Sequence, residues 1–75
     1  MARAKRTANE LISLIKERSI MAIGPWPPKM TMLIYPVNDT WEVMVSQGTT
    51  LDEENYRLAV LWIATQMELE FALEW

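Results

Sequence analysis

The stretch LDEENYRLAVLWIATQMELEFALEW, residues 51–75, contains no proline and no glycine, and its apolar side chains recur at helical spacing to the last residue. Just before it, Thr50 and Glu53 have the Thr-x-x-Glu spacing of a capping box at the start of a helix. Asp52, Glu53 and Glu54 add negative charge at the end of the helix where the backbone dipole is positive. The sequence therefore predicts one long helix over residues 51–75.

The predicted helix has two apolar stripes when successive residues are placed 100° apart. The first stripe consists of Tyr56, Ala59, Val60, Ile63, Met67 and Phe71. The second consists of Leu58, Trp62, Thr65, Leu69 and Leu73, at successive spacings of 4, 3, 4 and 4 residues, with Leu61 and Ala72 beside it. One stripe suffices to cover the rest of this short chain, so we expect the second stripe to lack a partner within the chain.

Residues 30–46 have the pattern of a β-hairpin, with β-prone segments on both sides of Asn38-Asp39. Both turn residues tolerate positive φ, so a two-residue turn is expected. It pairs Val37 with Thr40, Pro36 with Trp41, Ile34 with Val43 and Met32 with Val45. One face is then apolar (Met30, Met32, Ile34, Trp41, Val43, Val45) and the other mixed (Thr31, Leu33, Tyr35, Glu42, Met44, Ser46). A slip of one residue would mix the two faces, so the hydrophobic pattern selects this register.

A shorter helix is predicted over residues 7–22. Thr7 and Glu10 have the spacing of another capping box. One face of this helix gathers Ala8, Leu11, Ile12, Ile15, Ser19 and Ala22. Ile20 lies off this face, so a helix that ends near Arg18 is the alternative. The glycine–proline stop signal that follows favours the longer helix.

The whole chain predicts the α+β class in the order helix–β-hairpin–helix (α-β-β-α), with the long C-terminal helix packed on a two-stranded antiparallel sheet. Residues 7–75 are expected to form a single small domain, and residues 1–6 a basic flexible arm. The segment GPWPP, residues 24–28, predicts a stiff connector in which Trp26 closes one end of the core. Many small domains share this order of elements, so the order alone indicates no function.

Length and composition favour association as the means of completing the core. A chain of 75 residues buries only about 60% of its unfolded surface, and small domains usually add disulfides, a metal or a partner. The sequence contains no cysteine and no histidine, which excludes disulfides and the commonest metal ligands. About 24 helical residues also span roughly 36 Å, whereas six- or seven-residue strands span roughly 20–23 Å. The last helical turns are therefore expected to overhang the sheet.

The predicted partner is a second copy of the chain, because a stripe with near-heptad spacing can pack against its symmetry mate. The expected homodimer interface consists of Leu58, Trp62, Thr65, Leu69 and Leu73. Pairing of hairpin edges across the dimer is an equally self-complementary alternative. In two further alternatives, the same stripe binds a different protein as an adaptor, or the first helix covers both stripes within one chain.

No pattern in the sequence predicts catalysis or a cofactor. Ser13, Ser19 and Ser46 have no histidine to activate them, and the two glycines form no phosphate-binding loop. Glu70 and Glu74 lie four residues apart, but without a second acidic segment they are typical of a solvated helix end. We therefore expect a protein that is not an enzyme and that holds neither a metal nor a cofactor.

The uneven charge disfavours nucleic acid as the partner. Residues 1–29 carry a net charge of +4 and residues 30–75 carry −7, with a pI near 4.8. In the alternative function, that of a small nucleic-acid-binding or regulatory protein that uses the basic N-terminal arm, the phosphate contacts would be Arg3, Lys5 and Arg6. No stretch approaches the ~20 apolar residues of a membrane span, and no signal peptide is expected. The predicted location is the cytoplasm.

Overall fold

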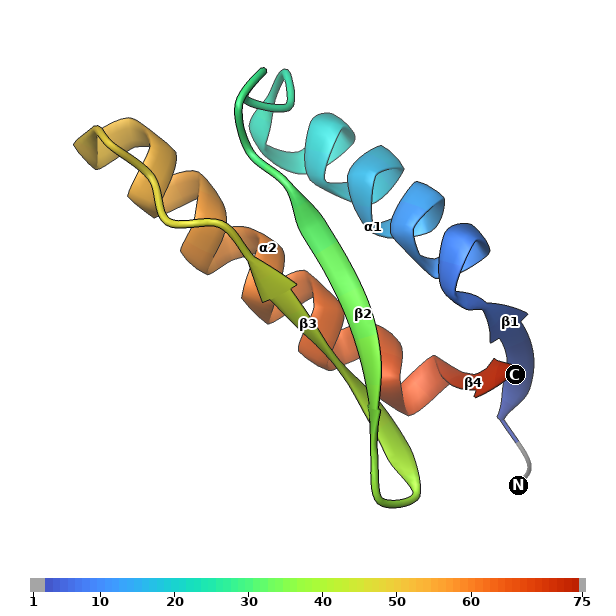
Figure 1. Ribbon diagram of the computed structural model, residues 1–75. Coiled ribbons are helices and arrows are strands. Elements are labelled where there is room, and N and C mark those ends of the chain that lie inside the picture. The colour runs from blue at the N-terminus through green and yellow to red at the C-terminus, as the bar shows by residue number, and fades with distance from the viewer. Residues whose placement is uncertain (1–2, 75) are drawn as a thin grey trace.

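The computed structural model describes residues 3–74, which form a small α+β fold (Figure 1). The elements in order are β1 (Ala4–Thr7), α1 (Ala8–Ile23), β2 (Met32–Val37), β3 (Thr40–Val45), α2 (Leu51–Glu70) and β4 (Phe71–Glu74). The two helices pack on each other, and the β2–β3 hairpin runs along them, with β2 on α1 and β3 on α2. A second, parallel strand pair joins β1 to β4 at one end of the molecule. The α+β class and the antiparallel hairpin are confirmed, whereas the parallel strand pair was not predicted.

The hairpin has the predicted register throughout. Its pairs include Met32 with Val45, Ile34 with Val43, and Pro36 with Trp41. Asn38 in the turn has φ 52°, which is the positive value that a tight hairpin turn requires. The predicted apolar face supplies three buried residues to the core, namely Met30, Trp41 and Val45.

Both predicted capping boxes are present. At the start of α1, the Thr7 amide donates to Glu10 Oε1 (2.9 Å) and the Glu10 amide donates to Thr7 Oγ1 (3.2 Å). Thr50 and Glu53 make the same reciprocal bonds at the start of α2. Helix α1 continues to Ile23, so the alternative in which it ends near Arg18 is wrong.

The C-terminal helix is shorter than predicted. α2 ends at Glu70, and Phe71 is extended (φ −127°, ψ 146°), so the helix predicted over residues 51–75 is wrong from residue 71 to residue 74. Residue 75 lies outside the described residues. As an extended segment, β4 can pair with β1 and return Phe71 and Leu73 to the core, instead of overhanging the sheet as a helix. Glu70 and Glu74 consequently do not share a helix face.

The partner of β4 comes from the segment predicted as an arm. Residues 4–6 of that segment belong to β1, which pairs Ala4 with Phe71 and Arg6 with Leu73. Three further contacts hold the junction of α2 and β4. The Trp41 indole N–H donates to the Phe71 carbonyl (2.9 Å), and the guanidinium groups of Arg6 and Arg18 lie 5.3 and 5.9 Å from the centre of the Phe71 ring.

The core lies between the helices and the inner face of the hairpin. Its buried apolar residues are Leu11, Ile15, Met30, Trp41, Val45, Tyr56, Val60, Ala64 and Met67. Trp26 packs against one end of this core as predicted, with its ring edge-on to Tyr56 and its indole N–H donating to the Met30 carbonyl (2.9 Å). At Gly48 a Cβ would lie 2.6 Å from the Cβ of Glu53, so only glycine allows the chain to pass this close to the first turn of α2.

Candidate functional site: the outer face of α2

Helix α2 turns one face into the core and leaves the opposite face exposed. The buried face consists of Tyr56, Val60, Ala64 and Met67. On the opposite side, the exposed fractions are 77% for Leu51, 58% for Leu58, 66% for Trp62 and 74% for Leu69. Four large apolar side chains are therefore aligned in solvent along the whole length of one helix.

We define the outer face of α2 by six residues with successive spacings of 4, 3, 4, 3 and 4. They are Leu51, Asn55, Leu58, Trp62, Thr65 and Leu69, and each is exposed. Four of the five residues predicted for the interface belong to this face, namely Leu58, Trp62, Thr65 and Leu69. Leu73 does not belong to this face, because it lies in β4 and packs against the core. Leu51 and Asn55 were missed, although continuing the 3-and-4 spacing toward the start of the helix would have found them.

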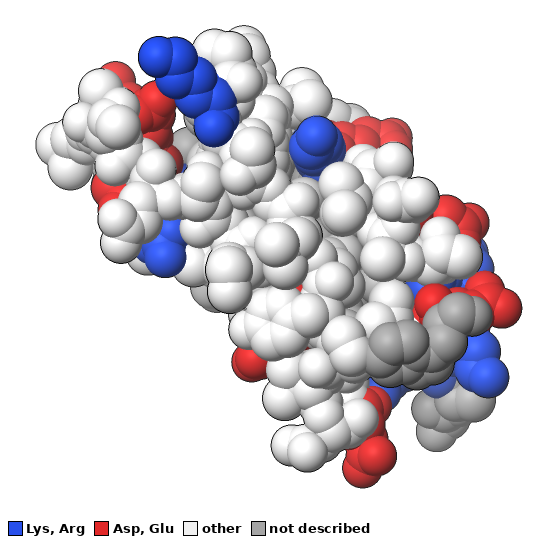
Figure 2. All heavy atoms as spheres, in the orientation of Figure 1, with Lys and Arg blue, Asp and Glu red and all other residues white. Residues whose placement is uncertain are grey.

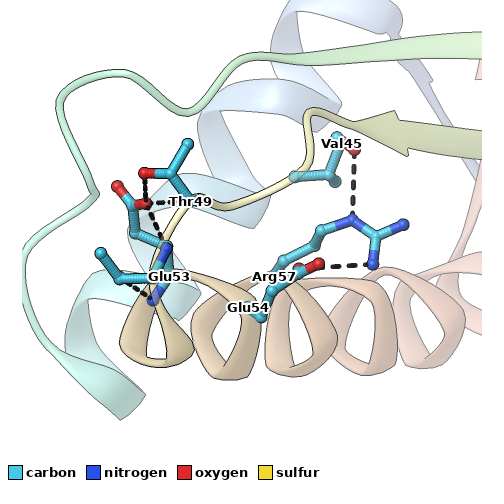
Figure 3. A network of polar contacts seen from close by, with 6 residues as sticks. Val45, Thr49, Glu53, Glu54 and Arg57 are labelled. Carbon is cyan, nitrogen blue, oxygen red and sulfur yellow. Dashed lines mark hydrogen bonds and ion pairs between the residues drawn. The ribbon is translucent and has the colours of Figure 1, made fainter.

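Polar contacts at the start of α2 fix the rotation of the helix about its axis (Figure 3). The Glu53 carboxylate accepts hydrogen bonds from the Thr49 amide and hydroxyl, each at 2.7 Å. One turn later, Arg57 Nε donates to the Val45 carbonyl of the hairpin (3.3 Å), and Arg57 Nη1 lies 3.6 Å from Glu54 Oε2. These contacts point Arg57 toward β3, so its charge lies beside the outer face and not on it.

The bond from Arg57 also covers part of the free edge of β3. Successive residues of an edge strand alternate between facing the neighbouring strand and facing outward. Because the Ser46 amide donates to Thr31 of the neighbouring segment (2.9 Å), the Val45 carbonyl faces outward. The Arg57 side chain is hydrogen-bonded to this carbonyl, which would otherwise be free to accept a hydrogen bond from an added strand.

A small cleft of about 170 Å³ lies between β3 and α2, next to the outer face. It is lined by Tyr35, Glu42, Val43, Leu61, Ala64, Thr65 and Glu68. Burial, followed by repulsion from Glu42, raises the pKa of Glu68 above its ordinary value, although Arg3 opposes this shift. Glu42 and Glu68 together give this cleft an acidic wall. Among residues 3–74, no group of three or more potential ligands is placed to hold a metal ion.

A second exposed apolar surface is the mixed outer face of the hairpin. Leu33 and Met44 are paired across the two strands, and both are about half exposed. Figure 2 shows this side of the molecule, where uncharged residues cover the middle and charged residues gather around the border. On the same face, the Tyr35 hydroxyl donates a hydrogen bond to Glu42 Oε2 (3.4 Å). This surface has fewer large exposed apolar side chains than the outer face of α2.

The basic residues predicted as nucleic-acid contacts are not gathered on one open surface. Arg3 donates to the backbone carbonyls of Glu68 and Asp39. Arg6 donates to the Lys5 carbonyl and lies over the ring of Phe71. Lys5 is exposed. The guanidinium groups of Arg3 and Arg6 thus have contacts within the chain.

The comparisons add no functional information. Searches with protein-family models, among curated proteins and among solved structures found no match. Within the described residues, neither helix is long and apolar enough to cross a membrane. The candidate site therefore rests on its own geometry.

Proposed function

We propose that the chain acts by protein–protein association and not by catalysis, as a homodimer formed through the outer face of α2. The observation that carries this proposal is the alignment of Leu51, Leu58, Trp62 and Leu69 in solvent, each more than half exposed. Monomeric proteins rarely expose contiguous apolar surface beyond a few hundred Å². A second copy offers the same surface, so that two such faces can remove each other from water.

Two observations favour the helix face over the alternatives. Pairing of hairpin edges along β3 as far as Val45 would have to displace Arg57 from the Val45 carbonyl. Binding of nucleic acid through the N-terminal residues would have to compete with the contacts that Arg3 and Arg6 make within the chain. The outer face of α2 needs no such rearrangement, because its apolar side chains are already exposed.

The decisive measurement is the mass in solution, by light scattering or sedimentation, over a range of protein concentrations. We expect the wild-type chain to be a dimer at high micromolar concentration. Trp62→Glu places a charge in the middle of the proposed interface and is expected to give a folded monomer, because Trp62 is exposed in the single chain. The matched control is Met21→Glu, which places the same charge at an 82% exposed position on α1 and should leave the dimer intact.

Two outcomes would contradict the proposal. A wild-type chain that stays monomeric at high micromolar concentration would exclude the homodimer and favour a different protein as the partner of this face. A dimer that survives Trp62→Glu would move the interface away from α2, and the hairpin surface around Leu33 and Met44 would become the first candidate. Circular dichroism of each variant establishes that the fold is retained.

A further inference from the structure

The outer face of α2 has the spacing of a coiled-coil seam. Its six members alternate between steps of 4 and 3 residues, which is the pattern of a and d positions in a heptad repeat. Leu51, Leu58 and Thr65 take one of these positions, and Asn55, Trp62 and Leu69 take the other. Residue 69 lies 18 helical steps after residue 51, so the seam is about 27 Å long. Its exposure along this whole length allows a second helix to lie against it.

We propose that two copies pack α2 against α2 in an antiparallel orientation, with the two-fold axis at the level of Val60. This inference rests on the proposed homodimer and specifies its geometry. In this register, Leu51 faces Leu69 of the second copy, Leu58 faces Trp62, and Asn55 faces Thr65. Every apolar side chain of the seam then meets an apolar one, and the two polar side chains meet each other.

Side-chain size distinguishes this register from a parallel one. In a parallel, in-register pair each residue would face its own copy, so that Trp62 would meet Trp62 and Thr65 would meet Thr65. The Trp62 layer would be overfilled and the adjacent Thr65 layer underfilled, and both defects destabilise a packed interface. The antiparallel register instead spreads the two indole rings over two layers, each opposite Leu58.

The residues that flank the seam near the axis also match. Ala59 and Leu61 are half-buried neighbours of the seam, one on each side. In the antiparallel register each of them lies beside its own copy across the axis, which extends the apolar contact at the centre of the interface. In a parallel pair, Leu61 would instead lie beside Gln66 of the second copy.

Electrostatics favour the same orientation. The first turn of α2 carries three acidic residues, Asp52, Glu53 and Glu54, and no basic residue. A parallel pair would bring both first turns together and place six carboxylates at one end of the interface. The antiparallel pair separates these turns by the length of the helix and sets the two helix dipoles in opposite directions.

The antiparallel register has one unfavourable contact, which makes it testable. Glu54 would lie beside Glu68 of the second copy on the cleft side of the seam, and like charges at flanking positions weaken a helix pair. Glu68→Lys turns both symmetry-related repulsions into attractions and is expected to lower the dimer dissociation constant about twofold to thirtyfold at low salt. In a parallel pair, residue 68 would face a position beyond the end of α2, so the same substitution would not tighten the dimer.

Disulfide trapping measures the orientation directly, because the natural sequence contains no cysteine. Leu51→Cys and Leu69→Cys are made separately at these exposed positions and oxidised alone and as an equal mixture. In the antiparallel dimer, residue 51 lies about 27 Å from its own copy, far beyond the 4.4–6.8 Å between Cα atoms that a disulfide needs. Each variant alone is therefore expected to give only the background of disulfides formed by random collision. The mixture is expected to give the disulfide between residue 51 of one copy and residue 69 of the other.

Two controls separate this inference from the proposed function. Met21→Cys, on the exposed part of α1, gives the collision background, and adding Trp62→Glu to both cysteine variants should abolish the mixed disulfide. Homodisulfides of Leu51→Cys and of Leu69→Cys above that background would overturn the antiparallel register while leaving the homodimer in place. If light scattering instead shows that both variants and the wild-type chain are monomers, the proposed function itself fails.

Discussion

The two faces of α2 are built from similar residues, yet they have opposite environments. The inner face, Tyr56, Val60, Ala64 and Met67, is buried, and the outer face keeps four large apolar side chains more than half exposed. Hydrophobicity therefore does not decide which face of this helix enters the core. What distinguishes the inner face is a set of polar contacts that lie beside its apolar residues.

Three polar contacts accompany the inner face. The Tyr56 hydroxyl donates to the Gly24 carbonyl at the end of α1 (2.8 Å), and Arg57 donates to Val45 on the hairpin. Glu53 ties the first turn to the loop through Thr49 and Thr50. If α2 rotated by half a turn, Tyr56 and Arg57 would both lose their partners. The outer face makes no comparable contact to α1 or the hairpin within residues 3–74.

The largest expected effect comes from truncating neighbouring positions on the two faces. Met67→Ala removes a fully buried side chain and is expected to lower the free energy of unfolding by about 2–5 kcal/mol. Leu69→Ala removes a side chain of similar size that is 74% exposed, and it should change the free energy of unfolding of the monomer by less than about 0.5 kcal/mol. Urea unfolding at a protein concentration low enough to keep the chain monomeric measures both values.

The same pair of variants should reverse its order in an association experiment. Leu69→Ala is expected to weaken the dimer, because Leu69 lies at the end of the proposed seam. Molecules of Met67→Ala that remain folded keep the outer face intact and should still form the dimer. Equal losses of monomer stability for the two variants would mean that Leu69 is buried in the single chain, in conflict with the contrast between the faces.

A smaller effect is expected from the pH dependence of the cap that fixes the rotation of α2. Hydrogen bonds from Thr49, and then from Thr50, lower the pKa of Glu53 below its ordinary value of 4.5. A carboxylate with a lowered pKa stabilises the folded state above the ordinary pKa, and this stabilisation is lost as the pH falls through the folded-state pKa. The midpoint of thermal unfolding should therefore fall as the pH decreases from about 5 to about 3.

Two substitutions isolate the contribution of Glu53 to this fall. Glu53→Gln retains a side chain that can complete a capping box but cannot titrate, so the fall should become shallower. Asp52→Asn removes another first-turn carboxylate, which makes no hydrogen bond to the cap in the described structure, and should leave the contribution of Glu53 in place. An unchanged slope in Glu53→Gln would show that this cap does not control the acid response.

Local features of the fold could be predicted from the sequence because their causes are local. The Asn38-Asp39 turn and the alternation of the flanking residues were sufficient to fix the hairpin register. The Thr-x-x-Glu spacings located the starts of both helices. The spacing of Leu58, Trp62 and Leu69 also identified the face of α2 that stays exposed.

The parallel pair of β1 and β4 could not be predicted in this way. Each strand has only four residues, and the partners are separated by almost the whole chain. The helical spacing of apolar residues continues through Phe71 and Leu73, so periodicity gave no reason to end α2 at Glu70. What ends the helix is tertiary, namely the bond from Trp41 to the Phe71 carbonyl and the strand supplied by residues 4–7. For the same reason, Leu73 could not be separated from the outer face by spacing alone.

The smallest expected effect concerns the one buried polar side chain of the described core. Ser19 on α1 is 0% exposed, and its hydroxyl has no hydrogen-bond partner among the described residues. On the outer face the corresponding polar residue is Thr65, which is exposed and whose hydroxyl donates to the Leu61 carbonyl (2.9 Å). The Thr65 hydroxyl is thus hydrogen-bonded where water is available, whereas the Ser19 hydroxyl is unbonded in the core.

Ser19→Ala is expected to raise the free energy of unfolding by about 1 kcal/mol, because burying an unbonded hydroxyl opposes folding by about 1–3 kcal/mol and the loss of the hydroxyl leaves only a small void. Alanine also has the higher helix propensity, and Ser13→Ala, at an exposed position of the same helix, measures that contribution alone. The difference between the two variants in urea unfolding therefore reports the buried hydroxyl. A less stable Ser19→Ala would mean that the hydroxyl has a partner in solution, and the contrast between the unbonded Ser19 hydroxyl and the bonded Thr65 hydroxyl would no longer hold.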